Sequence, residues 1–376
     1  MRIAIDAMTL SSQDTGVGIW TRGLIRSLTL LDRDNEYLIY HGLGAAGLSA
    51  LGSPKARYVP VPVPNTVRPV RVLYEQLLLP RRVRRDRVDV LHCPAYVRPL
   101  RAGVPTVVTV HDLFAFTHPG CCKRLNVLHF RLAMPPSIRR ATLIHCTSDW
   151  TRRMLAERFP QAAPKAHVIH PGVDDIFRPR GDDAGAAALF ARLGLAAPPF
   201  LFVGSAEPKK NVPLLLTAYA ELKRRFGTAR GLLMVGRRGW AVRPVLRCIA
   251  ALRLRRDVAR AGYVDRDQLP AIYRSSLALV FPSLCEGFGL PPVEAMACGI
   301  PVICTGGSGL AESADGAARI VPCDDPSALA EAMHEVEESA DLRARLREAG
   351  LRHAAGFRWE DKAREFVRLY ELAASQ

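Results

Sequence analysis

The sequence of 376 residues has few features of secreted or membrane-spanning proteins. Its nine cysteines are odd in number and never form a Cys-x-x-Cys pair, which argues against a disulfide framework and against a zinc site. Buried free thiols in a reducing compartment are our interpretation. No apolar run approaches the roughly 18 residues of a membrane-spanning helix, and Arg2 and Asp6 bring charge too early for a signal peptide. We therefore expect a cytoplasmic protein, or one attached to the inner face of the cytoplasmic membrane.

Acidic residues are scarce in the first half of the chain. The formal net charge is +16, and residues 1–180 hold 26 lysines and arginines against 13 aspartates and glutamates. Leucines are interspersed among the arginines between Arg68 and Arg87, which predicts a basic amphipathic helix. Such a helix fits an anionic membrane surface, where each basic residue contributes about 1 kcal/mol. A solvated arginine face is the alternative. Nucleic acid is a third partner for a basic protein, but no helix-turn-helix, zinc-finger or aromatic–basic pattern is present, and we expect none.

Short apolar segments alternate with amphipathic ones, which is typical of mainly parallel, doubly wound α/β sheets. The hydrophobic content of 49% suffices for two cores, and two domains fit the length. We expect an N-terminal Rossmann-like domain at 1–178, a proline- and glycine-rich linker with a short helix at 179–199 and a second Rossmann-like domain at 200–357. The expected strands are 2–6, 37–40, 57–61, 88–92, 106–111, 142–146, 167–170, 200–204, 231–235, 258–262, 277–281, 301–304 and 319–321. The expected helices are 19–31, 70–85, 126–140, 149–159, 212–226, 244–254, 266–275, 290–297, 327–339, 342–355 and 359–373.

The most informative segment follows the expected strand 277–281. It runs from Pro282 to Gly299 as Pro-Ser-Leu-Cys-Glu-Gly-Phe-Gly-Leu-Pro-Pro-Val-Glu-Ala-Met-Ala-Cys-Gly, with Glu286 and Glu294 eight positions apart. A strand, a glycine turn and a helix start form an anion site, because unpaired backbone N–H groups point into it. Ligands of such sheets bind beyond the carboxyl ends of the strands. The alternative is that Glu286 caps a helix and Glu294 lies in solvent.

Three other segments carry candidate ligands. Gly16-Val17-Gly18 lets the backbone approach a ligand closely, but the third glycine of the dinucleotide fingerprint is missing, which disfavours NAD. His111 ends the expected strand 106–111, where a lone histidine is usually structural. Lys209 and Lys210 precede a helix, where positive charge opposes the helix dipole unless an anion binds there.

The segment 282–299 resembles the signature of retaining, nucleotide-sugar-dependent glycosyltransferases, specifically glycosyltransferase family 4 with the GT-B architecture. Residues 16–18, 111 and 204–211 resemble further motifs in the family's order, so the resemblance covers nearly the whole chain. It implies two Rossmann-like domains that face a cleft. It also implies that the terminal segment 358–376 crosses back to pack on the first domain.

The resemblance also implies a role for each residue of a metal-independent site. Glu294 would accept hydrogen bonds from the ribose, Glu286 and the glycine turn would hold the sugar and the phosphate, and Lys210 would stabilise the leaving group. Many relatives have an arginine where this chain has Ser205, so Lys209 or backbone N–H groups would have to cover one phosphate contact. The donor-binding residues that we predict are Gly16, Val17, Gly18, Ser205, Lys209, Lys210, Val264, Glu286, Gly287, Phe288, Gly289, Leu290 and Glu294. The catalytic residues that we predict are His111, Glu286 and Lys210.

The form Glu-Pro-Lys-Lys-Asn at 207–211 resembles the mannosyl- and rhamnosyltransferase branch of bacterial surface-polysaccharide and lipopolysaccharide synthesis. We therefore expect GDP-mannose as a co-substrate, no metal or other cofactor, and an acceptor that is a saccharide or a polyprenyl-diphosphate-linked saccharide. A nucleotide-sugar epimerase and a glycogen-synthase-like enzyme are alternatives on the same fold. A non-catalytic polysaccharide-binding or nucleic-acid-binding protein is a further alternative.

Overall fold

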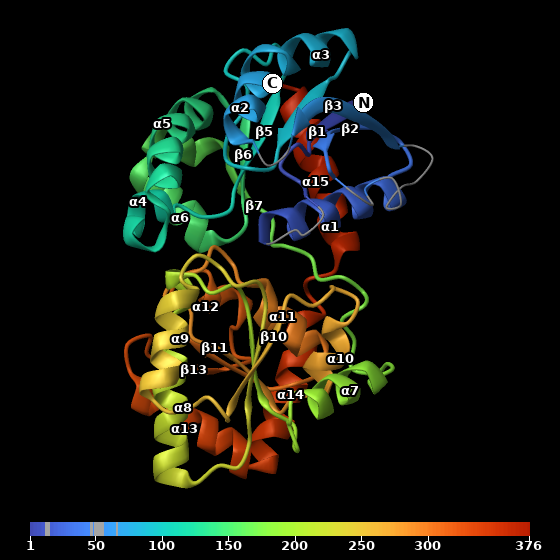
Figure 1. The fold of residues 1–376 in the computed structure, drawn as a ribbon. Coiled ribbons are helices and arrows are strands. Elements are labelled where there is room, and N and C mark those ends of the chain that lie inside the picture. Colours follow the sequence, from blue (N-terminus) through green and yellow to red (C-terminus); the bar gives the residue numbers. More distant parts are fainter. Residues whose placement is uncertain (12–15, 46–47, 49–55, 65–66) are drawn as a thin grey trace. The chain divides into compact units, whose positions relative to one another are not determined.

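The chain folds into two compact α/β units, drawn as a ribbon in Figure 1. This computed structural model describes residues 1–376 except 12–15, 46–47, 49–55 and 65–66. The first unit comprises Met1–Gly172 and Phe357–Gln376, and the second comprises Val173–Gly356. In each unit a parallel sheet is covered by helices, so the predicted doubly wound fold class is confirmed.

The first unit is built on seven parallel strands in the order β3-β2-β1-β4-β5-β6-β7. Ile3 and Ile5 of the central strand β1 pack into one apolar core, whereas Ala4 packs into the other. The sheet is therefore buried on both faces, as parallel sheets generally are. Its strands are β1 (Arg2–Asp6), β2 (Glu36–Leu43), β3 (Ala56–Pro64), β4 (Val90–Cys93), β5 (Thr106–Val110), β6 (Leu143–Cys146) and β7 (Ala166–Val168).

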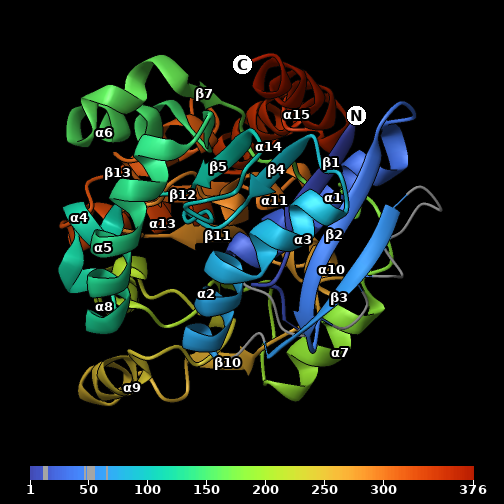
Figure 2. The same ribbon diagram turned by 90° about the horizontal axis from the view of Figure 1, so that it is seen from above.

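Helices cover both faces of this sheet (Figures 1 and 2). Residues of α1 and α15 complete one core, and residues of α3, α5 and α6 complete the other. The helices are α1 (Gly16–Leu31), α2 (Arg68–Leu77), α3 (Leu79–Arg85), α4 (Phe114–Thr117), α5 (Arg124–Arg140), α6 (Asp149–Arg158) and α15 (Trp359–Ala374).

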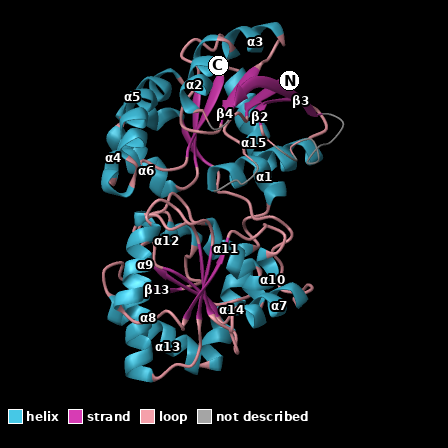
Figure 3. Cartoon of the chain, in the orientation of Figure 1, coloured by secondary structure: helices cyan, strands magenta, loops and turns pink. Residues whose placement is uncertain are grey.

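The second unit repeats the design with six parallel strands in the order β10-β9-β8-β11-β12-β13. Figure 3 shows α8, α9 and α13 on one side of this sheet and α7, α10, α11 and α14 on the other. The strands are β8 (Phe200–Val203), β9 (Leu232–Val235), β10 (Val258–Gly262), β11 (Ala278–Phe281), β12 (Val302–Thr305) and β13 (Arg319–Val321). The helices are α7 (Ala184–Arg192), α8 (Val212–Phe226), α9 (Val242–Ala251), α10 (Leu269–Arg274), α11 (Leu290–Ala297), α12 (Leu310–Ser313), α13 (Pro326–Glu338) and α14 (Ala340–Ala354).

The predicted linker 179–199 belongs to the second unit, and the short helix expected in it is α7. Helix α7 packs on α10, where an Arg274 Nη2 lies 2.7 Å from an Asp183 oxygen. The boundary between the units accordingly falls after Gly172 rather than after 178. Prolines and glycines marked the segment as a linker, but Ala186 and Phe190 are buried in the unit.

Two other predictions concern helices. The expected helix 70–85 is divided into α2 and α3, because Pro80 lacks the N–H that a continuous helix would donate to Gln76. The last helix, α15, does pack on the first unit, as the resemblance implied. There the Tyr370 hydroxyl lies 2.7 Å from Nδ1 of His92. Every predicted strand overlaps an observed strand.

The packing of α15 against α1 leads to a stability prediction. A methyl group added at Gly23 of α1 would lie 2.3 Å from the ring of Trp359, a contact that no relaxed side chain makes. We expect Gly23→Ala to destabilise the first unit by about 1–3 kcal/mol through overpacking. Thermal unfolding of the full chain would measure this effect. In the control variant Gly185→Ala in α7, nothing lies within 4 Å of the added methyl group, and stability should hold or rise. Equal effects of the two variants would contradict the prediction.

Candidate active site

Each parallel sheet has one point at which its strand order reverses. In the second unit it lies between the neighbours β8 and β11, since β9 and β10 extend the sheet on one side and β12 and β13 on the other. Loops leave the two strands there in opposite directions, which opens a crevice at their carboxyl ends. The segment 204–211 follows β8 and the segment 282–289 follows β11. Two separate predicted motifs therefore meet at one crevice.

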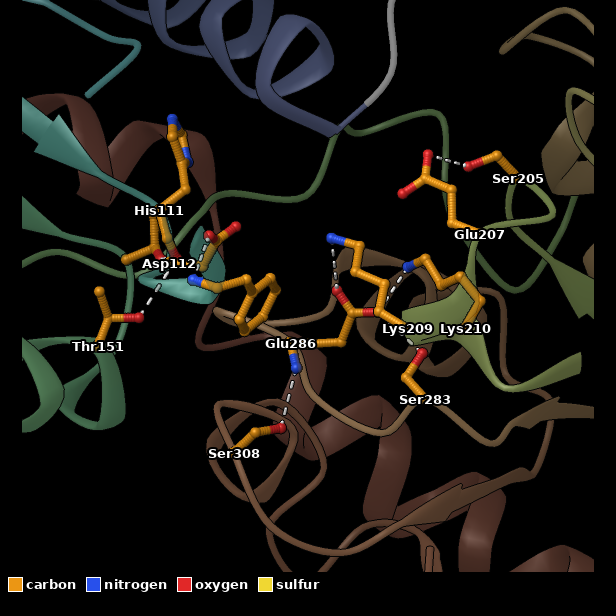
Figure 4. Close-up of polar contacts among 12 residues, drawn as sticks. His111, Asp112, Thr151, Ser205, Glu207, Lys209, Lys210, Ser283, Glu286 and Ser308 are labelled. Atoms are coloured by element: carbon orange, nitrogen blue, oxygen red, sulfur yellow. Dashed lines mark hydrogen bonds and ion pairs between the residues drawn. The ribbon is translucent and has the colours of Figure 1, made fainter. Parts of the chain in front are cut away.

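Lys210 and Glu286 are joined at this point (Figure 4). Nζ of Lys210 donates a hydrogen bond of 2.6 Å to Oε1 of Glu286 and lies 4.6 Å from the centre of the Phe281 ring. Nζ of Lys209 lies 3.9 Å from the other oxygen, Oε2. The loops are also joined through the backbone, because the Leu284 N–H donates to the Lys209 carbonyl at 2.8 Å. Two cations thus surround one carboxylate.

Glu286 is 7% exposed, and Oε1 of its carboxylate accepts two hydrogen bonds, one of them from Lys210. The Ser283 hydroxyl donates to Oε1 at 2.8 Å, and the Glu286 N–H donates to Oγ of Ser308 at 3.0 Å. Burial alone would raise the pKa of this carboxyl, but Lys210, Lys209 and Ser283 outweigh burial and lower the pKa. Glu286 is therefore an anion at neutral pH.

The turn from Gly287 to Leu290 is closely packed. Gly289 has a φ of 101° and precedes the first residue of α11, and a methyl group there would lie 2.6 Å from Leu310. Pro291 and Pro292 occupy the next helical positions and have no N–H. The start of α11 therefore offers an anion fewer backbone donors than an ordinary helix start, and the lysines supply the positive charge.

Glu294 belongs to a different group of hydrogen bonds. It is 3% exposed on α11 and accepts hydrogen bonds from Nη2 of Arg266 at 2.9 Å and from the Tyr273 hydroxyl at 3.1 Å. Nε of Arg266 also donates to Asp174 at 2.6 Å. Burial opposes the charge of Arg266, but Glu294 and Asp174 outweigh burial and raise its pKa. Neither Arg266 nor Tyr273 nor Asp174 was predicted as a site residue from the sequence.

Two of the residues predicted to bind the nucleotide-sugar donor lie outside the Lys210–Glu286 contact. Ser205 follows β8, and its hydroxyl donates to the Glu207 carboxylate at 2.8 Å. Val264 follows the edge strand β10, and no hydrogen bond between described residues links it to Glu286. Their contacts with a donor remain predictions.

His111 lies in the first unit, one residue beyond the end of β5. Its Nε2 lies 2.8 Å from the Pro94 carbonyl oxygen, and its own carbonyl accepts hydrogen bonds from the hydroxyls of Thr147 and Thr151. Gly16, Val17 and Gly18 form the first turn of α1. The Trp20 ring of the same helix lies 4.9 Å from the His111 ring, edge to face. Within this unit the predicted glycine turn and histidine are therefore neighbours.

The sequence contains Asp-x-Asp at 32–34 and at 265–267. Neither belongs to a group of three or more histidine, cysteine or acidic side chains that could hold a metal, as far as the structure describes the chain. No helix in the described ranges combines the length and apolar character needed to cross a bilayer.

The contacts of Glu294 lead to a second stability prediction. Removing the charge with Arg266→Met leaves the buried carboxylate of Glu294 and the half-buried one of Asp174 without their cation, and we expect a loss of about 3–5 kcal/mol. Denaturant unfolding would measure it. The control is Arg225→Met, which breaks ion pairs with Glu221 and Glu331 on the surface of the same unit and should change stability only slightly. If Arg266→Met lowered the free energy of unfolding no more than Arg225→Met, the ion pairs of Arg266 would not be what stabilises Glu294 in its buried position.

Known proteins resemble the chain in both units. Residues 16–176 match the family "Glycosyltransferase Family 4", and residues 194–353 match "Glycosyl transferases group 1". The chain is 26% identical over 368 residues to the O-antigen chain mannosyltransferase B of Escherichia coli, which covers 95% of this chain and 96% of that protein. It is 37% identical over 245 residues to the D-inositol 3-phosphate glycosyltransferase of Frankia alni, covering 62% of this chain and 59% of that protein.

Solved structures of low sequence identity share the fold. The sucrose-phosphate synthase of Thermosynechococcus elongatus superimposes with a TM-score of 0.79 at 22% identity and full coverage of both chains. HepE of Anabaena in complex with UDP and glucose superimposes with a TM-score of 0.75 at 18% identity and 98% coverage of both chains. The architecture is therefore the GT-B fold of two Rossmann-like domains. With a family 4 domain followed by a group 1 domain, the chain belongs to the glycosyltransferases of family 4.

Proposed function

We propose that the protein is a retaining, metal-independent hexosyltransferase that moves mannose from GDP-mannose to a glycan or a lipid-linked saccharide during surface-polysaccharide synthesis. The observation that carries the proposal is the Lys210–Glu286 pair, with Lys209 beside it, at the point where the strand order reverses. The similarity to an O-antigen chain mannosyltransferase over 95% of the chain supports the choice of sugar. Structural neighbours titled as complexes with UDP and UDP-glucose support a nucleotide-sugar donor.

The charges of this pair suit a diphosphate. Lys209, Lys210 and Glu286 together carry one net positive charge, so an arriving diphosphate competes with Glu286 for the lysines. When the diphosphate takes Lys210, the Glu286 carboxylate is released and can accept hydrogen bonds from the hydroxyl groups of the sugar. Negative charge on the departing diphosphate grows towards the transition state, so a fixed ammonium group favours the reaction more than it favours binding.

The reaction requires no protein nucleophile. The bond between the anomeric carbon and the phosphate oxygen breaks, and the acceptor oxygen bonds to the same face of that carbon. The acceptor's proton passes to the departing diphosphate, which balances the exchange. We assign Glu294 to the ribose and His111 to the transferred sugar. The ammonium groups of Lys209 and Lys210 do what a divalent cation does in metal-dependent transferases.

Donor binding and transfer test the proposal together. A panel of GDP-, UDP- and dTDP-sugars in a thermal-shift assay should show stabilisation by GDP-mannose, because a ligand of the folded state raises the unfolding temperature by mass action. Lys210→Met should lower kcat by about 100-fold to 1,000-fold, as the loss of one charge-stabilising donor does in other enzymes. Glu286→Gln should do likewise, and EDTA should leave kcat unchanged.

The matched control is Lys223→Met, on α8 of the same unit, where Nζ pairs with Asp257. It removes the same charge away from the strand-order reversal, so both binding and kcat should stay at the wild-type level. Undiminished transfer by Lys210→Met would refute the assignment of the leaving-group site. Consumption of donor without any acceptor would favour the epimerase.

We also propose that the first unit binds an anionic membrane surface, where a lipid-linked acceptor would be found. Large apolar side chains of α2 and α5 and their flanks are exposed, up to 78% at Leu125. The two helices are joined where Nη1 of Arg68 donates to Asn126 at 2.7 Å. Apolar side chains among arginines are typical of helices that lie in the membrane interface. The exposed apolar residues are Val67, Val70, Leu73, Leu77, Leu78, Leu125, Leu128 and Leu132.

Flotation with vesicles that contain phosphatidylglycerol tests the membrane proposal. The wild-type chain should float, and about 0.5 M salt should release most of it, because the Debye length then falls well below 10 Å. Replacing Leu125, Leu128 and Leu132 by serine should weaken binding more than tenfold, since each buried leucine contributes about 1.5–3 kcal/mol. Leu372→Ser on α15, an exposed leucine of the same unit, is the control. If neither salt nor the triple variant weakens binding to the vesicles, the proposal that this surface binds the membrane is wrong.

A further inference from the structure

A chain of four hydrogen bonds crosses the face of the first sheet that α1 and α15 cover. From the Tyr370 hydroxyl it runs to Nδ1 of His92 at 2.7 Å, and from Nε2 of His92 to Oγ1 of Thr109 at 2.7 Å. It continues from Oγ1 of Thr109 to Nδ1 of His145 at 3.0 Å, and it ends at the Ile169 carbonyl oxygen, 2.8 Å from Nε2 of His145. All four side chains are fully buried. The chain of hydrogen bonds therefore joins three neighbouring strands, β4, β5 and β6, to the C-terminal helix.

The direction of every hydrogen bond in this chain is determined. Burial lowers the pKa of His145 to about 3 and holds the pKa of His92 well below its usual range, so both imidazoles are neutral. The Ile169 carbonyl can only accept, so Nε2 of His145 carries the proton and Nδ1 accepts. The Thr109 hydroxyl then donates to His145 and accepts from Nε2 of His92. Nδ1 of His92 is left to accept from the Tyr370 hydroxyl. One arrangement of protons thus satisfies all four contacts.

Such a chain fixes the planes of its rings. Each of the two imidazoles is bonded through both of its nitrogens, so neither can rotate about χ2 without breaking two hydrogen bonds. A fully satisfied buried network specifies one packing arrangement, whereas an apolar core of the same volume tolerates several. His92 and His145 are therefore rigid surfaces for whatever packs on them.

The ring of Trp20 lies against one of these surfaces. It is stacked on His145, with 5.3 Å between the ring centres and 13° between the ring planes, and Phe366 of α15 packs 5.8 Å away. Trp20 is 2% exposed, and its buried indole N–H has no hydrogen-bond partner among the described residues. The orientation of the indole is therefore set by packing, and His145 is the neighbour that lies parallel to it.

Trp20 in turn forms one wall around His111, the predicted catalytic histidine. Their ring planes stand at 85°, the Tyr96 ring lies 5.5 Å from His111, and the Pro94 carbonyl accepts from Nε2 of His111. We propose that the buried hydrogen-bond chain positions His111 through Trp20. Its four side chains are positioning residues, since each acts through the indole. The inference rests on the proposed function, in which His111 contacts the transferred sugar.

The C-terminal helix then does more than complete an apolar core. Tyr370 begins the hydrogen-bond chain, although 278 residues separate it from His92. Phe366 of the same helix packs 4.7 Å from the His145 ring and 5.7 Å from the His92 ring. Helix α15 thus supports both imidazoles, and we expect a change at Tyr370 to reach His111.

Nitrogen NMR of the histidine rings in the full chain tests the proposal. Wild-type His92 and His145 should appear as neutral rings protonated at Nε2. Thr109→Val removes the central hydroxyl at nearly unchanged volume, so both imidazoles lose a partner and the His111 signals should shift or broaden. Thr109→Ser restores the hydroxyl and should restore the wild-type signals. A variant with His111→Gln assigns the His111 signals.

Donor affinity provides a second measurement. In calorimetry, Thr109→Val should weaken GDP-mannose binding about threefold to tenfold, the contribution of one hydrogen bond to the sugar, and should leave GDP binding unchanged. Thr109→Ser should bind both ligands as the wild type does. The control is Thr29→Val, which removes another buried hydroxyl of the same unit, where it donates to the Arg26 carbonyl of α1 at 3.3 Å. It should change neither the His111 signals nor either affinity.

Tyr370→Phe tests the same proposal if Thr109→Val does not fold. It keeps the ring beside Phe366 and removes only the hydroxyl, so Nδ1 of His92 loses its donor and the His111 signals should again shift. Unchanged His111 signals and GDP-mannose affinity in either folded variant would overturn the proposal, and so would a serine variant that does not restore them. If the wild-type chain does not bind GDP-mannose, the proposed function fails, and the His111 signals still decide the inference.

Discussion

The structure depends on one constraint, which is that all strands of each sheet run in the same direction. Every loop from a strand to the following helix then emerges at the same edge, and a crevice forms only where the strand order reverses. In the second unit this places the loops after β8 and β11 side by side, although 76 residues separate Lys210 from Glu286. In the first unit it places Asp6 beside the residues that follow β4. The place of the proposed donor site follows from the topology before any side chain is considered.

What distinguishes the two crevices is the balance of charge. Lys209 and Lys210 outnumber Glu286 in the second unit, whereas in the first unit the carboxyl groups of Asp6 and Glu75 are matched by Arg68 and Arg71. Buried ion pairs add little net stability, because desolvation offsets most of their attraction. The presence of two lysines beside Glu286 is better explained by a ligand, because a cationic crevice suits a diphosphate.

The strands could be predicted from the sequence because apolar runs locate strands, and the resemblance to the family implied that Lys210 and Glu286 share one site. The sequence did not reveal the partners of Glu294. Arg266 lies 28 residues away, in a loop without periodicity, and only tertiary packing brings it to α11. The short helix expected in the linker segment is α7, but local prolines and glycines hid that its buried stripe belongs to the second unit. Glu75 lies in the segment predicted as a basic amphipathic helix, and its burial depends on tertiary packing around α2.

In the proposed donor site, the Lys210–Glu286 pair would hold a diphosphate without a metal ion. A flexible lysine side chain that faces an empty crevice has no anion to hold it there. The Glu286 carboxylate keeps Lys210 in place until the diphosphate arrives. Ser283 and the Ser308 contact hold the glutamate itself, so its position does not depend on the lysine. The exchange of one anion for another at Lys210 leaves the cation in place, which is the preorganisation that electrostatic catalysis requires.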